Sequence, residues 1–296
     1  WADLGKGFQG GLIDVYIEGV EDIYALTDSL TATCANQEEK VKAIYDIITR
    51  EIKTMDETGG FLLHDHISEI LIDKNGAISD KNLLMTEMLK HSGLEAWPVL
   101  IGSRHKHIFM PKLFHLRQFD YLITACKIDG GFMFLDAQSE SIPYGVMPLS
   151  SRVDGGVIID GEKSYLAKIV YKDPETQRLD HTVIRLDSMG SAACSTHVEF
   201  SGYLASEFEQ SLTEENEEDL VKENFLDPLN LPYQLQEFTS QHHDLDKLSL
   251  DMTFSLEGLV SHLDDNYVIK PIRFFFRENP FTNKRRFSPI DFAGRY

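Results

Sequence analysis

Apolar residues recur at spacings of three and four along residues 20–53, a pattern typical of helices that bury one face. The clearest stripe lies in NQEEKVKAIYDIITREI and consists of Val41, Ile44, Tyr45, Ile48 and Ile52. Asn36 precedes this stripe and Glu39 follows three residues later, an arrangement that favours a capped helix start. We therefore expect a helix that begins after Asn36 and packs the stripe against the core.

A second helical pattern follows KNGAISD, a turn-like segment at residues 74–80. Gly93 is suited to end this helix because glycine readily adopts the left-handed backbone found after helix C-termini. The helix is predicted over about residues 79–91, and its inward side comprises Leu84, Met88 and Leu89.

The period then changes to two, which predicts strands at residues 95–103, 118–128 and 132–138. Asp129-Gly130-Gly131 predicts a tight hairpin between the last two strands, because such turns need positive φ angles. The loop is either Asp129-Gly130 or Gly130-Gly131. Under either register, side-chain alternation puts Tyr121 and Asp136 on one face of the hairpin and Cys126 on the other.

Beyond residue 154 the predicted elements are mostly short strands, in SYLAKIVY, HTVIRL, THVEFSGYL, YQLQEF, LSLDMTFSLEGLV and NYVIKPIRFFF. One acidic run, TEENEEDLVKENF at 213–225, predicts a helix with carboxylates in its first turn. Short strands separated by turn signals favour a β-sandwich-like domain. We therefore predict an α+β chain with two domains, residues 1–154 and residues 155–296.

Composition limits the classes of function. The chain has 296 residues, 42% of them apolar, and a formal net charge of −20. Its best basic run, KRR at 284–286, is short and isolated, so we expect no binding to nucleic acid. No apolar run reaches the roughly 18 residues of a membrane-spanning helix. The first residue is Trp1 rather than Met, so we expect the chain to be a piece of a longer protein.

Three segments follow a pattern known from bacterial proteins: KVKAIYDIITREI, SEILIDKNGAISDKNLLMTEMLKHSGLEAWPVLIGSR and QFDYLITACKIDGGFMFLDAQSESIPYGVMP. Together they resemble the core of the transglutaminase-like, or cysteine-protease-like, superfamily in the form typical of Bacteroidetes. In that pattern G-D-C-K-D-K opens a helix, F-N-H lies on the next strand and W-L-D-A follows. ENPFTNKRRFSPIDF, residues 278–292, resembles the associated C-terminal domain of unknown function. The resemblance implies a papain/transglutaminase-like first domain, with helices packed on an antiparallel sheet, and a periplasmic or cell-surface location.

The resemblance also implies a Cys-His-Asp triad, of which this chain keeps only Asp136. Ile78 stands at the Cys position and Tyr121 at the His position. Ile78 has no lone pair with which to attack a carbonyl, and Tyr121, whose usual pKa is about 10, is a poor base at neutral pH. We expect a catalytically degenerate protein without a cofactor. It would bind a peptide, another small ligand or a protein partner, or serve as a structural module, and Trp97 and Tyr144 would flank its cleft.

Several readings of single residues stay open on the sequence alone. A hydrogen bond from Tyr121 to Asp136 would satisfy both groups. Ser79 could be a displaced nucleophile, but one helical step turns it by about 100° from the nucleophile position, which favours a role as N-cap.

The main alternative is an active peptidase, amidase or acyltransferase. It would use a relocated set of residues, drawn from Ser79, His64, His66 and Asp136, or a metal-activated water. Each of two His-x-His pairs could give a metal two imidazoles, although loop histidines are the expected reading. The pairs are His64/His66 and His105/His107.

Overall fold

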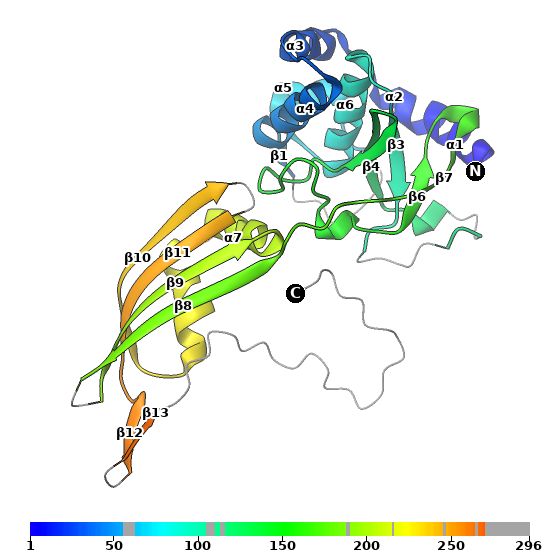
Figure 1. Ribbon diagram of the computed structural model, residues 1–296. Helices are drawn as coiled ribbons and strands as arrows, with labels where there is room; N and C mark the ends of the chain where they lie inside the picture. The colour runs from blue at the N-terminus through cyan, green and yellow to red at the C-terminus, as the bar shows by residue number, and fades with distance from the viewer. Residues whose placement is uncertain are drawn as a thin grey trace. The chain divides into compact units, whose positions relative to one another are not determined.

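The computed structural model describes residues 1–55, 63–104, 110–112, 116–187, 190–214, 216–244, 247–263 and 266–269 (Figure 1). These residues belong to two compact units, Trp1–Asp173 and Pro174–Tyr296. Both units combine helices with antiparallel sheets, which confirms the α+β class.

Helices make up one layer of the first unit. They are α1 (Ala2–Phe8), a π-helical turn (Gln9–Ile13), α2 (Asp14–Tyr16), α3 (Glu21–Thr31), α4 (Gln37–Glu51), α5 (Ile67–Asp73) and α6 (Ile78–His91). The predicted cap of α4 is confirmed, because the Glu39 N–H donates to Asn36 Oδ1 at 2.9 Å. The Glu39 carboxylate in turn accepts from the Ala35 N–H at 2.8 Å. Such reciprocal bonds satisfy amide groups that a helix start otherwise leaves without partners.

Helix α6 is the central helix of this unit. It runs between the sheet and the helices α3, α4 and α5 (Figure 1). Every side chain from Ser79 to Leu89 is buried, polar ones included. A helix buried on all sides needs partners for its polar groups. Gly93 follows it with φ of 87°, as the sequence predicts.

The sheet of the first unit has the strand order β5-β4-β3-β6-β7, all antiparallel. Ile128 pairs with Gly131, so Asp129 and Gly130 form the hairpin loop, one of the two predicted registers. The strands are β3 (Ala96–Ile101), β4 (Tyr121–Ile128), β5 (Gly131–Leu135), β6 (Gly155–Ile158) and β7 (Tyr165–Lys168). The pair β1 (Lys53–Thr54) and β2 (Asn75–Gly76) is parallel, and short 3-10 turns lie at Leu116–Gln118, Leu149–Ser151 and Gly161–Lys163.

The two faces of this sheet bury different clusters. The face toward α6 carries Leu100, Leu122, Cys126 and Leu135, which join the core made by the helices. The opposite face carries a second cluster that includes Val99, Ile101, Tyr121, Ile123 and Phe134. Adjacent strand residues therefore serve different cores, as alternation requires. The predicted placement of Cys126 and Tyr121 on opposite faces is confirmed.

The second unit contains a four-stranded antiparallel sheet in the order β10-β11-β9-β8. Its strands are β8 (Gln177–Leu186), β9 (Ala192–Ser201), β10 (Tyr233–Asp244) and β11 (Lys247–Leu256). Between β9 and β10 come α7 (Tyr203–Glu214), α8 (Glu217–Val221), a π-helical turn (Lys222–Leu226) and a 3-10 turn (Asp227–Leu229). These helices share one apolar cluster with β9 and β11. A short hairpin follows, β12 (Val260–Leu263) with β13 (Asn266–Ile269).

The described structure differs from the predicted organisation in two places. The units divide between Asp173 and Pro174 rather than after residue 154, because β6 pairs with β3 and so belongs to the first sheet. In the described part of the second unit, helices rather than a second sheet cover the buried face of the long sheet. The specific β-sandwich expectation is therefore not confirmed. The segment ENPFTNKRRFSPIDF lies outside the described residues.

Candidate functional site

The start of helix α6 is built by a close approach of two chain segments. Gly76 lies against Ile70 so closely that a Cβ on it would come within 2.9 Å of the Ile70 Cγ2. Ala77 is extended, with φ of −66° and ψ of 155°, and is the N-cap residue. The Lys81 N–H donates to the Ala77 carbonyl at 3.0 Å, which closes the first turn. Ile78 is thus the first helical residue, at the positive end of the helix dipole.

Ile78 is partly exposed and packs against the cluster that contains Tyr121. Asp136 follows β5, is fully buried and lies next to Tyr121. Ile78, Tyr121 and Asp136 therefore lie around one region at the start of α6. Ile78 thus shares an apolar cluster with Tyr121, the neighbour of Asp136.

Asn82 holds Asp136 in place, a role that the sequence interpretation missed. Its Nδ2 donates to Asp136 Oδ1 and to the Leu122 carbonyl, each at 2.9 Å. Its Oδ1 accepts from the Ala137 N–H at 2.8 Å. Asn82 is one helical turn after Ile78 and so lies on the same side of α6. No sequence signal identified Asn82, because polar residues surround it on the helix, including Ser79 and Thr86.

The Tyr121 hydroxyl and Asp136 lie close enough for the predicted hydrogen bond. Burial, and next the nearby Asp136 charge, raise the pKa of Tyr121 well above its usual value. A hydrogen bond between the two side chains also contributes to both pKa shifts, although the Tyr121 hydroxyl and Asp136 Oδ2 miss strict hydrogen-bond geometry. The predicted contact is therefore present, but its hydrogen-bond geometry is poor. Burial also raises the pKa of Asp136, and the amide of Asn82 opposes that effect.

A buried amine completes this region. Lys81 Nζ donates to the Ile52 carbonyl at 2.8 Å and to Thr54 Oγ1 at 2.9 Å. Burial lowers the pKa of Lys81 to about 8, against the opposing effect of the Asp136 charge. With its ammonium engaged by backbone and hydroxyl, Lys81 joins α6 to β1 and supplies a positive charge near Asp136.

The alternative catalytic residues have other positions. Ser79 is buried in the first turn of α6, and the N-cap is Ala77 rather than Ser79. His64 lies 4.0 Å from Asp80 through Nδ1, and the Asp80 carboxylate accepts the His64 N–H at 3.1 Å. His66 precedes α5 and packs against Tyr16 with ring centroids 5.6 Å apart. The Asp80 carboxylate accepts from the backbone of His64, whereas Asp136 accepts from the side chain of Asn82.

No group of three or more His, Cys, Asp or Glu side chains suited to a metal ion occurs among the described residues. His105 and His107 lie outside those residues. Burial raises the pKa of the Cys126 thiol to about 11, and Cys126 belongs to the cluster on the α6 face of the sheet. This thiol is therefore poorly ionised and is separated from Tyr121 by the sheet.

Trp97 and Tyr144 do not line one cleft together. Trp97 belongs to the cluster that includes Tyr121 and contacts Phe132 with ring centroids 5.8 Å apart. Tyr144 packs on the helix side of the sheet, where its ring lies 5.8 Å from that of Tyr45. Only Trp97 shares a face with Ile78.

Comparison with known proteins adds little to this geometry. No family model matches the sequence, and no curated protein matches it. A solved structure of a putative protease from Parabacteroides distasonis is similar over 85% of this chain, with 12% sequence identity and a TM-score of 0.41. The alignment covers 52% of that protein, so this chain spans about half its length. A likeness at this level identifies neither fold family nor activity.

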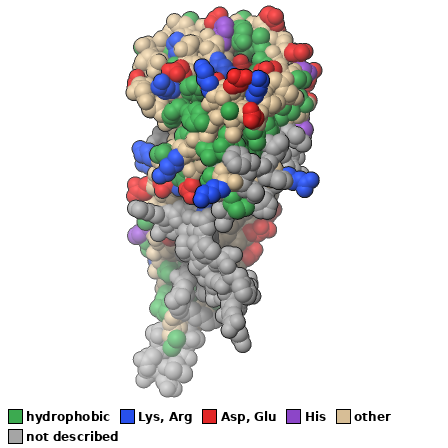
Figure 2. All heavy atoms as spheres, turned by 90° about the vertical axis from the view of Figure 1, so that its right-hand side faces the viewer, with side chains coloured by type: hydrophobic (Ala, Val, Ile, Leu, Met, Phe, Trp, Pro, Cys, Tyr) green, Lys and Arg blue, Asp and Glu red, His purple; other side chains and the backbone are tan. Residues whose placement is uncertain are grey.

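The surface gives two further observations. On the face drawn in Figure 2, basic and acidic side chains lie interspersed with apolar ones instead of gathering by sign. Among the described helices, none is long and apolar enough to cross a membrane.

Proposed function

We propose that this chain is a catalytically degenerate transglutaminase-like protein whose first unit serves in binding or as a structural module. The observation that carries the proposal is the placement of Ile78 at the start of α6, beside Tyr121 and the fully buried Asp136. With a thiol at the Ile78 position and an imidazole at the Tyr121 position, these residues and Asp136 would supply the nucleophile, base and carboxylate of an acyl-transfer triad. An alkyl group and a phenol at these positions supply neither nucleophile nor base.

The proposal extends to location and ligand. The resemblance in sequence supports a periplasmic or cell-surface protein, and the partly exposed surface around Ile78 and Trp97 is where we expect a peptide to bind. Peptide binding to the folded state must raise the melting temperature, whereas a purely structural module would melt at a constant temperature across a peptide series.

Restoring the two missing groups tests the framework directly. The test uses Ile78→Cys alone and Ile78→Cys with Tyr121→His, both in a Cys34→Ser background because Cys34 is the least buried native thiol. Iodoacetamide alkylation is measured against pH. We expect the midpoint for the double variant to lie about 1 to 2 pH units below that for the single variant, because a neighbouring imidazolium stabilises the thiolate.

Two controls sharpen this result. Adding Asp136→Asn should return the midpoint toward that of the single variant, because the carboxylate no longer supports the imidazolium. Equal midpoints in the single and double variants would contradict the proposed correspondence. Turnover of peptide or amide substrates by the unmodified protein, lost in Asp136→Ala, would instead support an active enzyme.

A further inference from the structure

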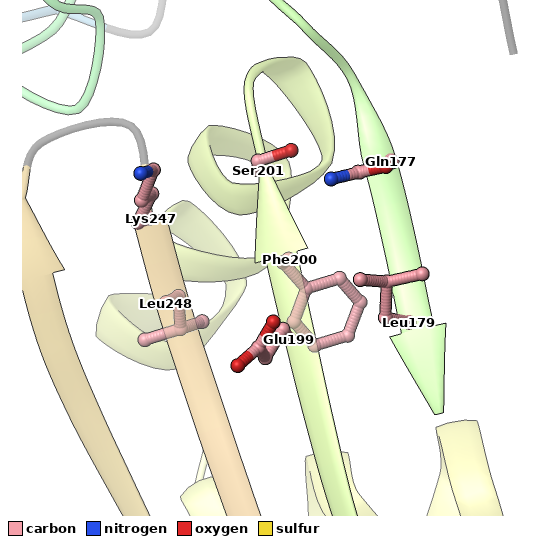
Figure 3. A pocket seen from close by; sticks show the side chains of 7 residues that line it. All are labelled: Gln177, Leu179, Glu199, Phe200, Ser201, Lys247 and Leu248. Carbon is pink, nitrogen blue, oxygen red and sulfur yellow. The ribbon is translucent and has the colours of Figure 1, made fainter. Parts of the chain in front are cut away.

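The second unit has a pocket on the face of its long sheet that the helices do not cover. Cross-strand pairing places Gln177, Ser201 and Lys247 side by side, from β8, β9 and β11. Leu179 and Glu199 form the next row on the same face, two residues further along their strands. The pocket has a volume of about 430 Å³ and is lined by these five residues with Phe200 and Leu248 (Figure 3). That volume lies within the usual range for small-ligand sites.

The first row offers hydrogen-bond donors. Figure 3 shows the side chains of Gln177 and Ser201 pointing toward one another from neighbouring strands, with Lys247 beyond Ser201. Ser201 Oγ donates to the Glu175 carbonyl at 2.8 Å. Within the described part of the chain, the Gln177 amide and the Lys247 ammonium have no hydrogen bond or ion pair. An ammonium beside an amide is suited to a carboxylate.

The second row offers the opposite charge and an apolar surface. Glu199 is exposed, and its Oε1 lies 3.4 Å from His197 Nε2. His197 makes a shorter contact, 2.8 Å, between its Nδ1 and Asp251 Oδ1. Glu199 is therefore only loosely engaged and can accept from a ligand ammonium. Leu179, 52% exposed, stands beside it on β8 and offers contact to an apolar side chain.

The distance between the two rows selects the size of the ligand. Rows two residues apart along a strand are separated by about 7 Å, at about 3.4 Å per residue. Two extended peptide residues also span about 7 Å, whereas a single amino acid covers about half of that. We propose that this pocket binds a short peptide of dipeptide length through both of its charged ends. The carboxylate contacts Lys247 and Gln177, the ammonium contacts Glu199, and an apolar N-terminal side chain contacts Leu179.

The test uses the full chain and the dipeptide L-leucylglycine, followed by changes in backbone amide chemical shift. Because exposed charge pairs each contribute little, we expect a dissociation constant on the order of 1 mM. The shifts should concentrate at Gln177, Ser201 and Lys247. N-acetyl-leucylglycine, leucylglycine amide and free leucine serve as ligand controls, and each should bind about five-fold more weakly or worse.

Variants assign each end of the ligand to its residue. Lys247→Met should weaken leucylglycine about five-fold and leave the affinity for the C-terminal amide unchanged. Glu199→Gln should weaken leucylglycine but not the N-acetylated peptide. Lys168→Met, an exposed lysine of the first unit, is the matched control and should have no effect.

Three outcomes would overturn the proposal. They are equal binding of free and blocked peptides, sensitivity to the carboxylate end alone, and the absence of shifts at these strands at about ten times the expected dissociation constant. The ligand series on the unmodified protein gives this answer without any variant. It is also independent of the proposed function, because it concerns the second unit and not the region around Ile78.

Discussion

Replacing Asn82 by Ala should be among the most destabilising single substitutions in the first unit. The change removes three hydrogen bonds, to Asp136 Oδ1, the Leu122 carbonyl and the Ala137 N–H. Each buried group left without a partner costs about 1–3 kcal/mol, so the three losses together should lower the free energy of unfolding by roughly 3–9 kcal/mol. The better helix propensity of Ala offsets less than about 1 kcal/mol of this loss.

Trp1 and Trp97, the two tryptophans of the chain, both lie in the first unit, so tryptophan fluorescence during urea unfolding reports on that unit alone. Asn36→Ala is the matched control. It also removes Asn side-chain bonds, but at an exposed helix cap, and should cost about 1 kcal/mol.

A second variant protects the test if Asn82→Ala does not fold. Asn82→Asp keeps an acceptor for the Ala137 N–H but sets a second carboxyl against Asp136. Its destabilisation should be largest at neutral pH and smaller near about pH 4, where the two carboxyls can share a proton. If Asn82→Ala costs no more than Asn36→Ala, then Asn82 does not hold Asp136 and the account of this region is wrong.

Three other predictions concern single sites. Tyr121→Phe should change the free energy of unfolding by less than about 1 kcal/mol, because the lost hydroxyl has poor hydrogen-bond geometry toward Asp136. Tyr45→Phe loses a 3.0 Å bond to the Ile142 carbonyl and should destabilise by about 1 kcal/mol in the same urea assay. A larger loss in Tyr121→Phe than in Tyr45→Phe would show that the Tyr121 hydroxyl is well bonded. Burial raises the pKa of Asp80 from 3.8 to about 6, so the folded first unit binds more protons in this window and its stability should fall as pH rises through it. The fall should be smaller in Asp80→Asn, where the raised pKa of Asp136 still contributes a fall of the same sign. An unchanged pH profile in Asp80→Asn would contradict the assigned burial of Asp80. Gly202 has φ of 60°, and a Cβ there would lie 2.6 Å from Thr176 Oγ1. Gly202→Ala should therefore lower the calorimetric melting temperature of the second unit far more than Gly93→Ala lowers that of the first, because the space around Gly93 is open. Equal shifts in melting temperature would refute the close approach at Gly202.

The sequence predicts those elements whose signals are local. The cap at Asn36 and the period of the following residues predict α4, and the Asp129-Gly130-Gly131 turn predicts the β4–β5 hairpin. Side-chain alternation also predicts the separation of Tyr121 from Cys126, because alternation depends only on strand geometry. These features need no knowledge of which segments meet in space.

Features that depend on distant pairing are missed. The sequence interpretation predicts no strand at residues 155–158, and no local pattern shows that β6 pairs with β3. That pairing belongs to a first unit that extends to Asp173. The run THVEFSGYL reads as one strand, yet Gly202, with φ of 60°, ends β9 and allows α7 to begin at Tyr203. Leu204, Phe208 and Leu212 then share one face of that helix. The left-handed conformation of Gly202 thus marks the point where the predicted strand ends and α7 begins.

In the candidate site, the sequence predicts the neighbours of Asp136 more successfully than their bonds. The shared face of Tyr121 and Asp136 follows from strand alternation, but their hydrogen bond depends on side-chain geometry, which no sequence pattern encodes. Asn82 and Lys81 were missed because polar residues on a helix are ordinarily assigned to solvent. Here α6 is enclosed on all sides, so its polar groups turn to the strands and to the segment before α5.

If the proposed function holds, Asp136 is kept without catalytic partners, and the cost of single changes would explain why. Removing one member of a buried polar network leaves the others uncompensated, so each single loss costs more than the loss of the network as a whole. Asp136 is bonded to Asn82 and lies near the Lys81 ammonium, which supplies a structural reason to keep the carboxylate. On this account, Asn82→Ala and Asp136→Ala should be strongly coupled. The double variant should be more stable than the sum of the single losses predicts, by about 1–3 kcal/mol. Additive losses would mean that Asp136 is held by other groups, and its retention would again call for a catalytic explanation.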